Sequence, residues 1–97
     1  MTTEAIALIT IKDTDKLAAY REHAAEALAR HQGRVVGAGP AETLESAFEA
    51  PSVAARLAFP TVEHARGWIN DPELSDVHAM RNAAGLSTIV ILPALTT

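Results

Sequence analysis

The first apolar segment, Glu4–Ile11, constrains the fold most, because both of its alternating sets of side chains are apolar. In a strand, Ile6 and Leu8 would share one face, and the opposite face would carry Ala5, Ala7, Ile9 and Ile11. A strand with one face in water alternates apolar with polar residues instead. The segment therefore predicts a strand that is covered on both sides.

The segments that follow predict helices and strands in turn. The pattern predicts a helix from Thr14 or Asp15 to His31, with N-cap residue types at Asp13, Thr14 and Asp15 and a stop at Gly33. Further strands are predicted at Arg34–Ala38, Val53–Phe59 and Ser87–Leu92, with a weaker strand or extended arm at Thr43–Phe48. The second helical region begins at Thr61, which is its N-cap candidate, is broken at Asn70–Pro72 and continues over Glu73–Ala84.

The resulting order β-α-β-β-α-β predicts a ferredoxin-like α+β fold, an antiparallel sheet with the helices on one face. That arrangement leaves the other sheet face bare, although Glu4–Ile11 and Ser87–Leu92 are apolar on both faces. A second copy packed against this face is the simplest cover, so we expect a homodimer through the sheet. A monomer is the alternative, because antiparallel sheets often leave one face wet.

Composition narrows the functional classes. The chain has 97 residues and a net charge of -4, which fits a single domain over residues 1–97 and offers no basic stripe for nucleic acid. Its apolar runs are too short for a membrane helix, and the Met-Thr-Thr-Glu start lacks the basic region of a signal peptide. We therefore expect a cytoplasmic protein. The absence of cysteine excludes disulfides, thiol nucleophiles and iron–sulfur clusters, and leaves the redox compartment unreadable.

One stretch of the sequence resembles a known family. Phe59-Pro60-Thr61-x-Glu63-x-Ala65-x-x-Trp68, followed by Asp71-Pro72-Glu73-Leu74 and Arg81, is similar to the signature of the "thirteen-thirty" family of domains of unknown function. Gln32 stands where that family often has glycine, and Ile69 and Leu74 stand where it has tyrosine. The resemblance implies a dimeric α/β-barrel in which each subunit has a cleft between sheet and helices. The wider superfamily includes cofactor-free monooxygenases, lactone isomerases and haem proteins, but the family brings no assigned reaction.

Arg81 is the first candidate for a binding site. On a helical wheel it lies among Leu74, Val77 and Ala84, inside the apolar sector. A guanidinium placed there needs a carboxylate or carbonyls, or it binds an anionic ligand bidentately. The structural explanations are an ion pair with Glu45 or Glu42, or a stem that snorkels to solvent. Arg21, inside the stripe of the first helix, is interpreted as a snorkelling or interface residue.

Three further side chains are candidates for the same cleft. Trp68 and Tyr20, the sole residues of their types, lie on apolar helix faces and either fill the core or line the cleft. His78, one turn from Arg81, is the histidine we nominate as a general base, although the pattern favours a surface position for it.

Metal and dinucleotide sites are not supported by the spacing. The four histidines form no HxH or HxxxH pair. The Gly37-Ala38-Gly39 turn resembles the start of a flavin-binding fingerprint, but Glu42 replaces its third glycine and no helix pattern follows. We therefore expect neither a metal nor a cofactor.

Two functions remain after these exclusions. The first is a binding module for a small acidic or aromatic metabolite, with Arg81 as anion clamp and with Trp68 and Tyr20 as apolar walls. The second is a cofactor-independent enzyme, of monooxygenase or isomerase type, with His78 as base and Arg81 as oxyanion stabiliser.

Overall fold

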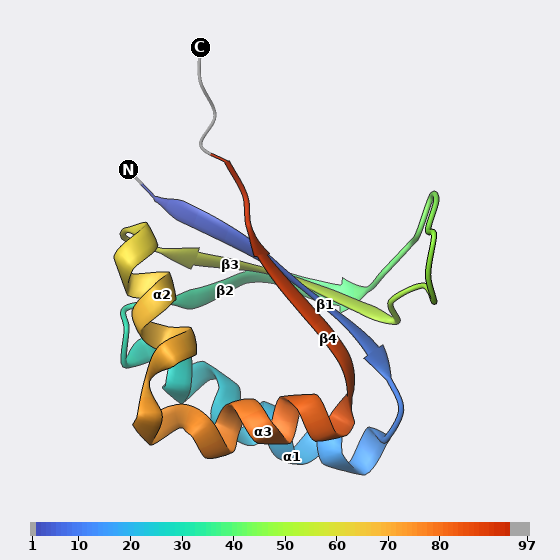
Figure 1. The fold of residues 1–97 in the computed structure, drawn as a ribbon, viewed down its shortest axis with the longest axis horizontal. Coiled ribbons are helices and arrows are strands. Elements are labelled where there is room, and N and C mark those ends of the chain that lie inside the picture. The colour runs from blue at the N-terminus through green and yellow to red at the C-terminus, as the bar shows by residue number, and fades with distance from the viewer. Residues whose placement is uncertain (1, 94–97) are drawn as a thin grey trace.

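The computed structural model describes residues 2–93 as an antiparallel sheet with helices packed on one of its faces (Figure 1). The strands are β1 (Thr3–Ile11), β2 (Arg34–Pro40), β3 (Val53–Phe59) and β4 (Gly85–Ile91). The helices are α1 (Thr14–Ala29), α2 (Val62–Asn70) and α3 (Ser75–Ala84), with a single 3-10 turn, η1 (Pro72–Leu74), between α2 and α3. This order confirms the predicted ferredoxin-like fold and its divided second helical region.

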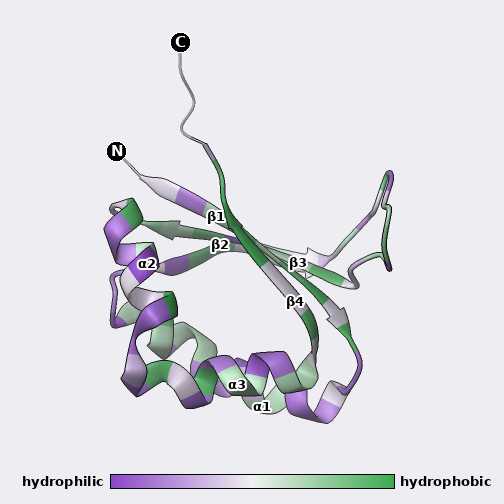
Figure 2. Ribbon diagram, in the orientation of Figure 1, coloured by the Kyte–Doolittle hydropathy of each residue, from purple (hydrophilic) through white to green (hydrophobic). Residues whose placement is uncertain are grey.

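The sheet has the strand order β2-β3-β1-β4, with every neighbouring pair antiparallel. In β1 the residues Ala5, Ala7 and Ile9 are buried against the helices, while Ile6 and Leu8 face the opposite side and are half-buried. Both faces of β1 are therefore apolar, as its sequence predicts. Figure 2 shows that hydrophobic residues run along much of the sheet, whereas the helices are mixed.

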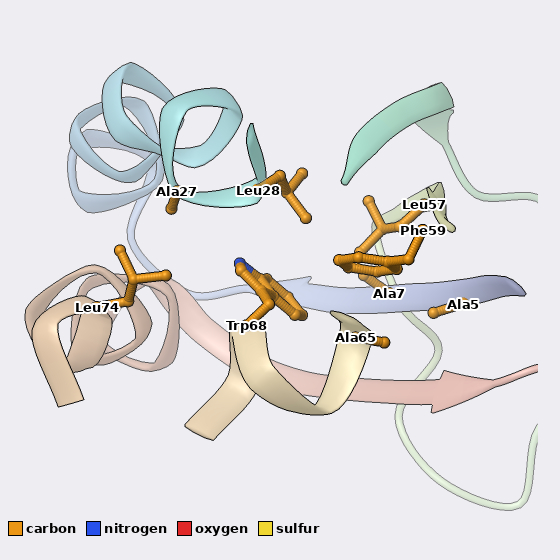
Figure 3. Packing of buried hydrophobic residues seen from close by; sticks show 9 residues of the cluster. All are labelled: Ala5, Ala7, Ala27, Leu28, Leu57, Phe59, Ala65, Trp68 and Leu74. Atoms are coloured by element: carbon orange, nitrogen blue, oxygen red, sulfur yellow. The ribbon is translucent and has the colours of Figure 1, made fainter. Parts of the chain in front are cut away.

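The core lies between the sheet and the helices, and Trp68 of α2 is at its centre (Figure 3). The Trp68 ring centroid is 5.7 Å from that of Phe59 on β3. Several other residues of this core are alanines: Ala5, Ala7, Ala27 and Ala65. Small side chains at these positions bring α1 and α2 close to the sheet.

The helix starts follow the capping prediction. The Asp13 carboxylate accepts a hydrogen bond from the Lys16 backbone N–H at 3.0 Å, and the Thr61 hydroxyl accepts one from the His64 N–H at 3.3 Å. Each cap satisfies one of the backbone donors that a helix leaves free in its first turn.

The end of α1 differs from the prediction. The helix ends at Ala29 rather than His31, and Gln32, not Gly33, adopts the left-handed conformation, with φ of 59°. The Gly33 N–H binds the Leu28 carbonyl at 2.8 Å and the Gln32 N–H binds that of Ala29 at 3.0 Å, which is the Schellman pattern. Gly33 is needed for a different reason, because a Cβ there would lie 2.5 Å from the Phe59 ring.

The segment predicted as a weak strand or extended arm, Thr43–Phe48, joins no sheet and lies in the loop between β2 and β3. This loop projects beyond the end of the sheet (Figure 1). Leu44 and Phe48 within it are 94% and 88% exposed. The strand interpretation is therefore wrong, and a segment that projects from the sheet agrees with the arm interpretation.

Candidate functional site

A cavity of about 140 Å³ lies between α1 and the inner face of the sheet. Its walls come from α1, α2, α3 and all four strands, and four of the lining residues are alanines: Ala7, Ala24, Ala38 and Ala55. The cavity exists because these short side chains do not fill the layer between helix and sheet. Exposed Val35 and Arg21 belong to its lining, which places its mouth between β2 and α1.

The charged groups of this cavity are all cationic. Arg81 and Arg21 line it, and no aspartate or glutamate does so among residues 2–93. Arg81 is 4% exposed and reaches the lining from α3, whereas Arg21 is exposed on α1. The site is thus an apolar space with a buried positive charge inside and a second one at the rim.

Neither structural explanation for Arg81 is observed. The guanidinium does not snorkel to solvent, and Glu42 and Glu45 lie in the exposed loop between β2 and β3. Within residues 2–93 no carboxylate lies within ion-pair distance of Arg81, and its Nε is buried without a hydrogen-bond partner. An unpaired buried charge is expensive, with an effective penalty of several kcal/mol.

Aromatic rings offset part of that cost. The Arg81 Cζ lies 5.7 Å from the ring centroid of Tyr20 and 5.5 Å from that of Trp68. Desolvated cation–π contacts contribute about 2 kcal/mol or more. They do not neutralise the charge, and they leave the Nε–H donor unsatisfied. A bound anion would neutralise the charge and accept the hydrogen bond of Nε–H.

His78 is buried, at 9% exposure, so the expected surface position is wrong. The reason is a backbone partner that the sequence does not reveal: His78 Nε2 lies 2.8 Å from the Trp68 carbonyl, across the turn between α2 and α3. Its Nδ1 lies 2.9 Å from Arg81 Nη1. Because a carbonyl accepts and a guanidinium donates, Nε2 carries the proton and Nδ1 is the acceptor.

The electrostatics agree with a neutral imidazole. Burial lowers the pKa of His78 below its ordinary value, and the positive charge of Arg81 lowers this pKa further. The hydrogen bond to the Trp68 carbonyl and the charge of Asp71 oppose this shift. His78 lies behind Arg81 and does not line the cavity. Its two ring nitrogens are engaged within the protein, one by the Trp68 carbonyl and the other by Arg81.

Trp68 and Tyr20 line the cavity together with Arg81. Trp68 therefore belongs to the core and to the cavity wall at once. Its Nε1–H is buried without a partner, and Figure 3 shows this nitrogen turned toward the helix that carries Ala27 and Leu28. The Tyr20 hydroxyl accepts a long hydrogen bond of 3.5 Å from Arg81 Nη1. The structure thus brings three of the four predicted residues to one cavity, with His78 directly behind them.

A second polar cluster lies at the end of α1, and sequence reasoning missed it. Asp71 binds His31 Nε2 at 2.9 Å and the Glu73 backbone N–H at 2.8 Å, and Arg30 contacts both Asp71 and Glu73. These contacts lower the pKa of Asp71, the His31 hydrogen bond first. The Asn70-Asp71-Pro72 turn was the available signal, since aspartate before proline often caps a following turn.

Two wider hollows lack such chemistry. One of about 500 Å³ is lined by residues such as Glu4, Val62 and Ile91, and one of about 300 Å³ lies between the projecting loop and the outer sheet face. Neither contains a buried charged side chain. Residues 2–93 contain no group of three histidine, aspartate or glutamate side chains placed to hold a metal ion. No helix in the same range is long and apolar enough to cross a membrane.

Solved structures confirm the ferredoxin-like fold. A protein of unknown function from Rhodopseudomonas palustris is 20% identical with a TM-score of 0.78, over 99% of this chain and 84% of that one. A dimeric ferredoxin-like protein of unknown function from Jannaschia sp. CCS1 is 11% identical with a TM-score of 0.72, over 97% and 100% of the two chains. SnoaB, a cofactor-independent oxygenase from Streptomyces nogalater, is 14% identical with a TM-score of 0.67, over 99% and 94%.

At these identities the likeness concerns the fold alone. The family is established separately: the sequence profile of the domain of unknown function DUF1330 matches residues 4–95, and the chain belongs to that family. This confirms the resemblance found in the sequence. No curated protein matches the chain significantly.

Proposed function

We propose that this protein binds a small anionic ligand with an apolar body in the cavity between α1 and the sheet. The observation that carries the proposal is the buried, unpaired guanidinium of Arg81 in an otherwise apolar space. Proteins bury charge when it is paired, or when function requires it. Here the missing negative charge would come from the ligand.

The size of the space limits the ligand. A cavity of about 150 Å³ accommodates a benzene-sized molecule, and this one measures about 140 Å³. Tyr20 and Trp68 offer aromatic surface to a ring, and the open mouth between β2 and α1 allows a substituent to reach Arg21. A one-ring aromatic or alicyclic acid therefore fits both the volume and the charge.

The enzymatic alternative is less well supported by the geometry. A general base needs a ring nitrogen free to take a substrate proton. Both nitrogens of His78 are engaged, one by the Trp68 carbonyl and one by Arg81. The role of His78 as a catalytic base stays a prediction, and binding is the function that the arrangement favours.

A titration with benzoate tests the proposal, because Trp68 is the sole tryptophan and reports directly on the cavity. We expect saturable quenching by benzoate, none by benzyl alcohol, and none in Arg81→Met. Native mass spectrometry of gently purified protein checks in parallel for a retained acid. Equal quenching by benzoate and benzyl alcohol, or unchanged quenching in Arg81→Met, would contradict an anion clamp.

We also propose that two copies pair through the outer face of the sheet. Leu86 and Val90 of β4 are 59% and 48% exposed there, and they lie beside Thr10 and Ile6 of β1. Phe48 of the projecting loop lies over the same face and helps to line the hollow of about 300 Å³. A second copy would cover these apolar side chains together, which a lone chain of this size leaves in water.

Mass measurement of the intact protein under native conditions tests the pairing. We expect a dimer for the wild type and a monomer for Leu86→Asp, because a carboxylate in the centre of an apolar interface is left unpaired. Arg66→Asp, an exposed change on α2 away from the outer face, is the control and should remain dimeric. A monomeric wild type would refute the proposal.

A further inference from the structure

We propose that His78 is a positioning residue: it holds one end of the Arg81 guanidinium so that the opposite edge is presented to a planar carboxylate. The inference rests on the proposed anion-binding function, and it assigns both the ligand's charged group and the residue that sets the clamp's orientation.

All the hydrogen bonds that the Arg81 side chain makes within residues 2–93 leave from Nη1. One goes to His78 Nδ1 at 2.9 Å and the other to the Tyr20 hydroxyl at 3.5 Å. The Nε–H is buried and has no partner. Since Nη1 lies on the far side of the guanidinium from the Nε–H, the edge formed by Nε and Nη2 is the one left free.

That edge is suited to a particular acceptor. Nε–H and one Nη2–H are parallel donors, and a carboxylate accepts both in a planar, bidentate pair. A tetrahedral sulfonate or phosphonate can also bind this edge through two of its oxygens. Its third oxygen, however, leaves the guanidinium plane and would have to be desolvated in a space with a largely apolar lining, so the site favours the carboxylate. The second orphaned donor nearby, Trp68 Nε1–H, also requires an acceptor, and in the described part of the chain (residues 2–93) no carboxylate side chain lines the cavity to supply one.

His78 is fixed from behind. Its Nε2–H donates to the Trp68 carbonyl, and its ring packs edge-on against the Trp68 indole, with centroids 5.0 Å apart and an interplanar angle of 84°. These two contacts set the ring orientation and the tautomer, so that Nδ1 points at Arg81 as an acceptor. Two hydrogen bonds therefore connect the α2 backbone through His78 to the Arg81 guanidinium.

Two amide substitutions separate the two nitrogens of His78. His78→Asn retains an acceptor near the position of Nδ1, and His78→Gln retains a group near that of Nε2 but none that reaches Arg81. We expect benzoate affinity within about 3-fold of wild type for His78→Asn and at least about 10-fold weaker for His78→Gln, which is ~1.4 kcal/mol. The preference for benzoate over benzenesulfonate, which we expect in the wild type, should survive in the first variant and vanish in the second.

The outcomes separate a positioning role from simple packing. Equal loss of affinity in both variants with an unchanged benzoate preference would mean that His78 only fills space, and it would overturn the inference. Wild-type affinity and preference in His78→Gln would overturn it as well. If the wild type binds no benzoate at all, or binds it without Arg81, the proposed function itself fails.

A measurement on the wild type keeps the inference testable if a variant does not fold. Nitrogen-15 NMR distinguishes the imidazole tautomers, and His78 should be neutral with its proton on Nε2, both free and with benzoate bound. A proton on Nδ1 at neutral pH would overturn the inference, because Nδ1 could then accept nothing from Arg81.

Discussion

Arg30 and Arg81 are set in opposite surroundings. Arg30 follows the end of α1 with its side chain 46% exposed, and it contacts the carboxylates of Glu73 and Asp71. Arg81 is 4% exposed and has no carboxylate partner within residues 2–93. The arginine that water already solvates has two acids beside it, and the arginine that most needs an acid has none.

The difference shows that Arg81, and not Arg30, is the position that lowers the stability of the fold. Exposed ion pairs contribute about 0–1 kcal/mol, so the Arg30 cluster fastens α1 to the α2–η1 turn only weakly. A buried unpaired charge costs several kcal/mol, which the cation–π contacts of Arg81 offset only in part. A purely structural position would be filled better by an apolar side chain, and the retained charge points to a ligand.

Replacing Arg81 by methionine removes the buried charge and keeps an apolar stem. Arg81→Met should reduce benzoate affinity by at least about 100-fold, or ~2.7 kcal/mol, while lowering the free energy of unfolding by no more than about 1 kcal/mol. Calorimetric titration and urea unfolding give the two quantities on the same sample.

Arg30→Met is the matched control. It should cost at most about 1 kcal/mol of stability, because the Arg30 side chain is 46% exposed in both of its pairs, and it should leave benzoate affinity unchanged. If Arg81→Met unfolds the protein while Arg30→Met does not, Arg81 is a structural residue and the anion clamp is refuted.

The stability of the two regions should respond to acid in different pH ranges. The pKa of His78 is lowered in the fold from its ordinary 6.5, so the unfolded chain binds the proton more readily. The stability that neutral His78 contributes is complete above pH 6.5 and is lost as the pH falls below it. The pKa of Asp71 is also lowered, from 3.8, so its contribution is lost only below that pH.

Unfolding measured from pH 7.5 to pH 3 resolves the two losses. His78→Asn should abolish the loss of stability that begins at pH 6.5 and keep the one that begins at pH 3.8. Substitution of the exposed His23 by asparagine should leave both losses in place. If His78→Asn still loses stability as the pH falls below 6.5, a different group titrates in that range.

Gln32 lies in the turn that ends α1, two residues after Arg30. Gln32 has a φ of 59°, in the left-handed region that glycine occupies without strain. Gln32→Gly should raise the free energy of unfolding by about 1 kcal/mol and leave benzoate affinity unchanged, since Gln32 does not line the cavity. A loss of stability on urea unfolding would contradict the assignment of strain to this residue.

Much of the fold could be predicted from residue patterns. The apolar residues in both alternating sets predicted that β1 is covered on both faces. N-cap residue types placed the first helix start within residues 13–15 and the second at Thr61. Those features depend on neighbours in sequence. The end of α1 was placed two residues late, because a Schellman turn can set its left-handed residue on glutamine as well as on glycine.

The site was only partly predictable, because residue patterns report on neighbours in sequence and not on contacts between distant segments. A helical wheel placed Arg81, Trp68 and Tyr20 on apolar faces, and the structure brings them to one cavity. The wheel could not show that Glu42 and Glu45 lie in a projecting loop, or that the Trp68 carbonyl buries His78. Both facts depend on contacts between segments far apart in the chain or across a turn.

The central claim is that the unpaired donors of this cavity receive a carboxylate. Because Trp68 is the sole tryptophan, its indole Nε1–H gives a single proton–nitrogen resonance that can be followed during a benzoate titration. We predict a saturable downfield shift of this resonance together with that of Arg81 Nε–H, with neither moved by benzyl alcohol. Resonances that stay in place at saturating benzoate would contradict the account.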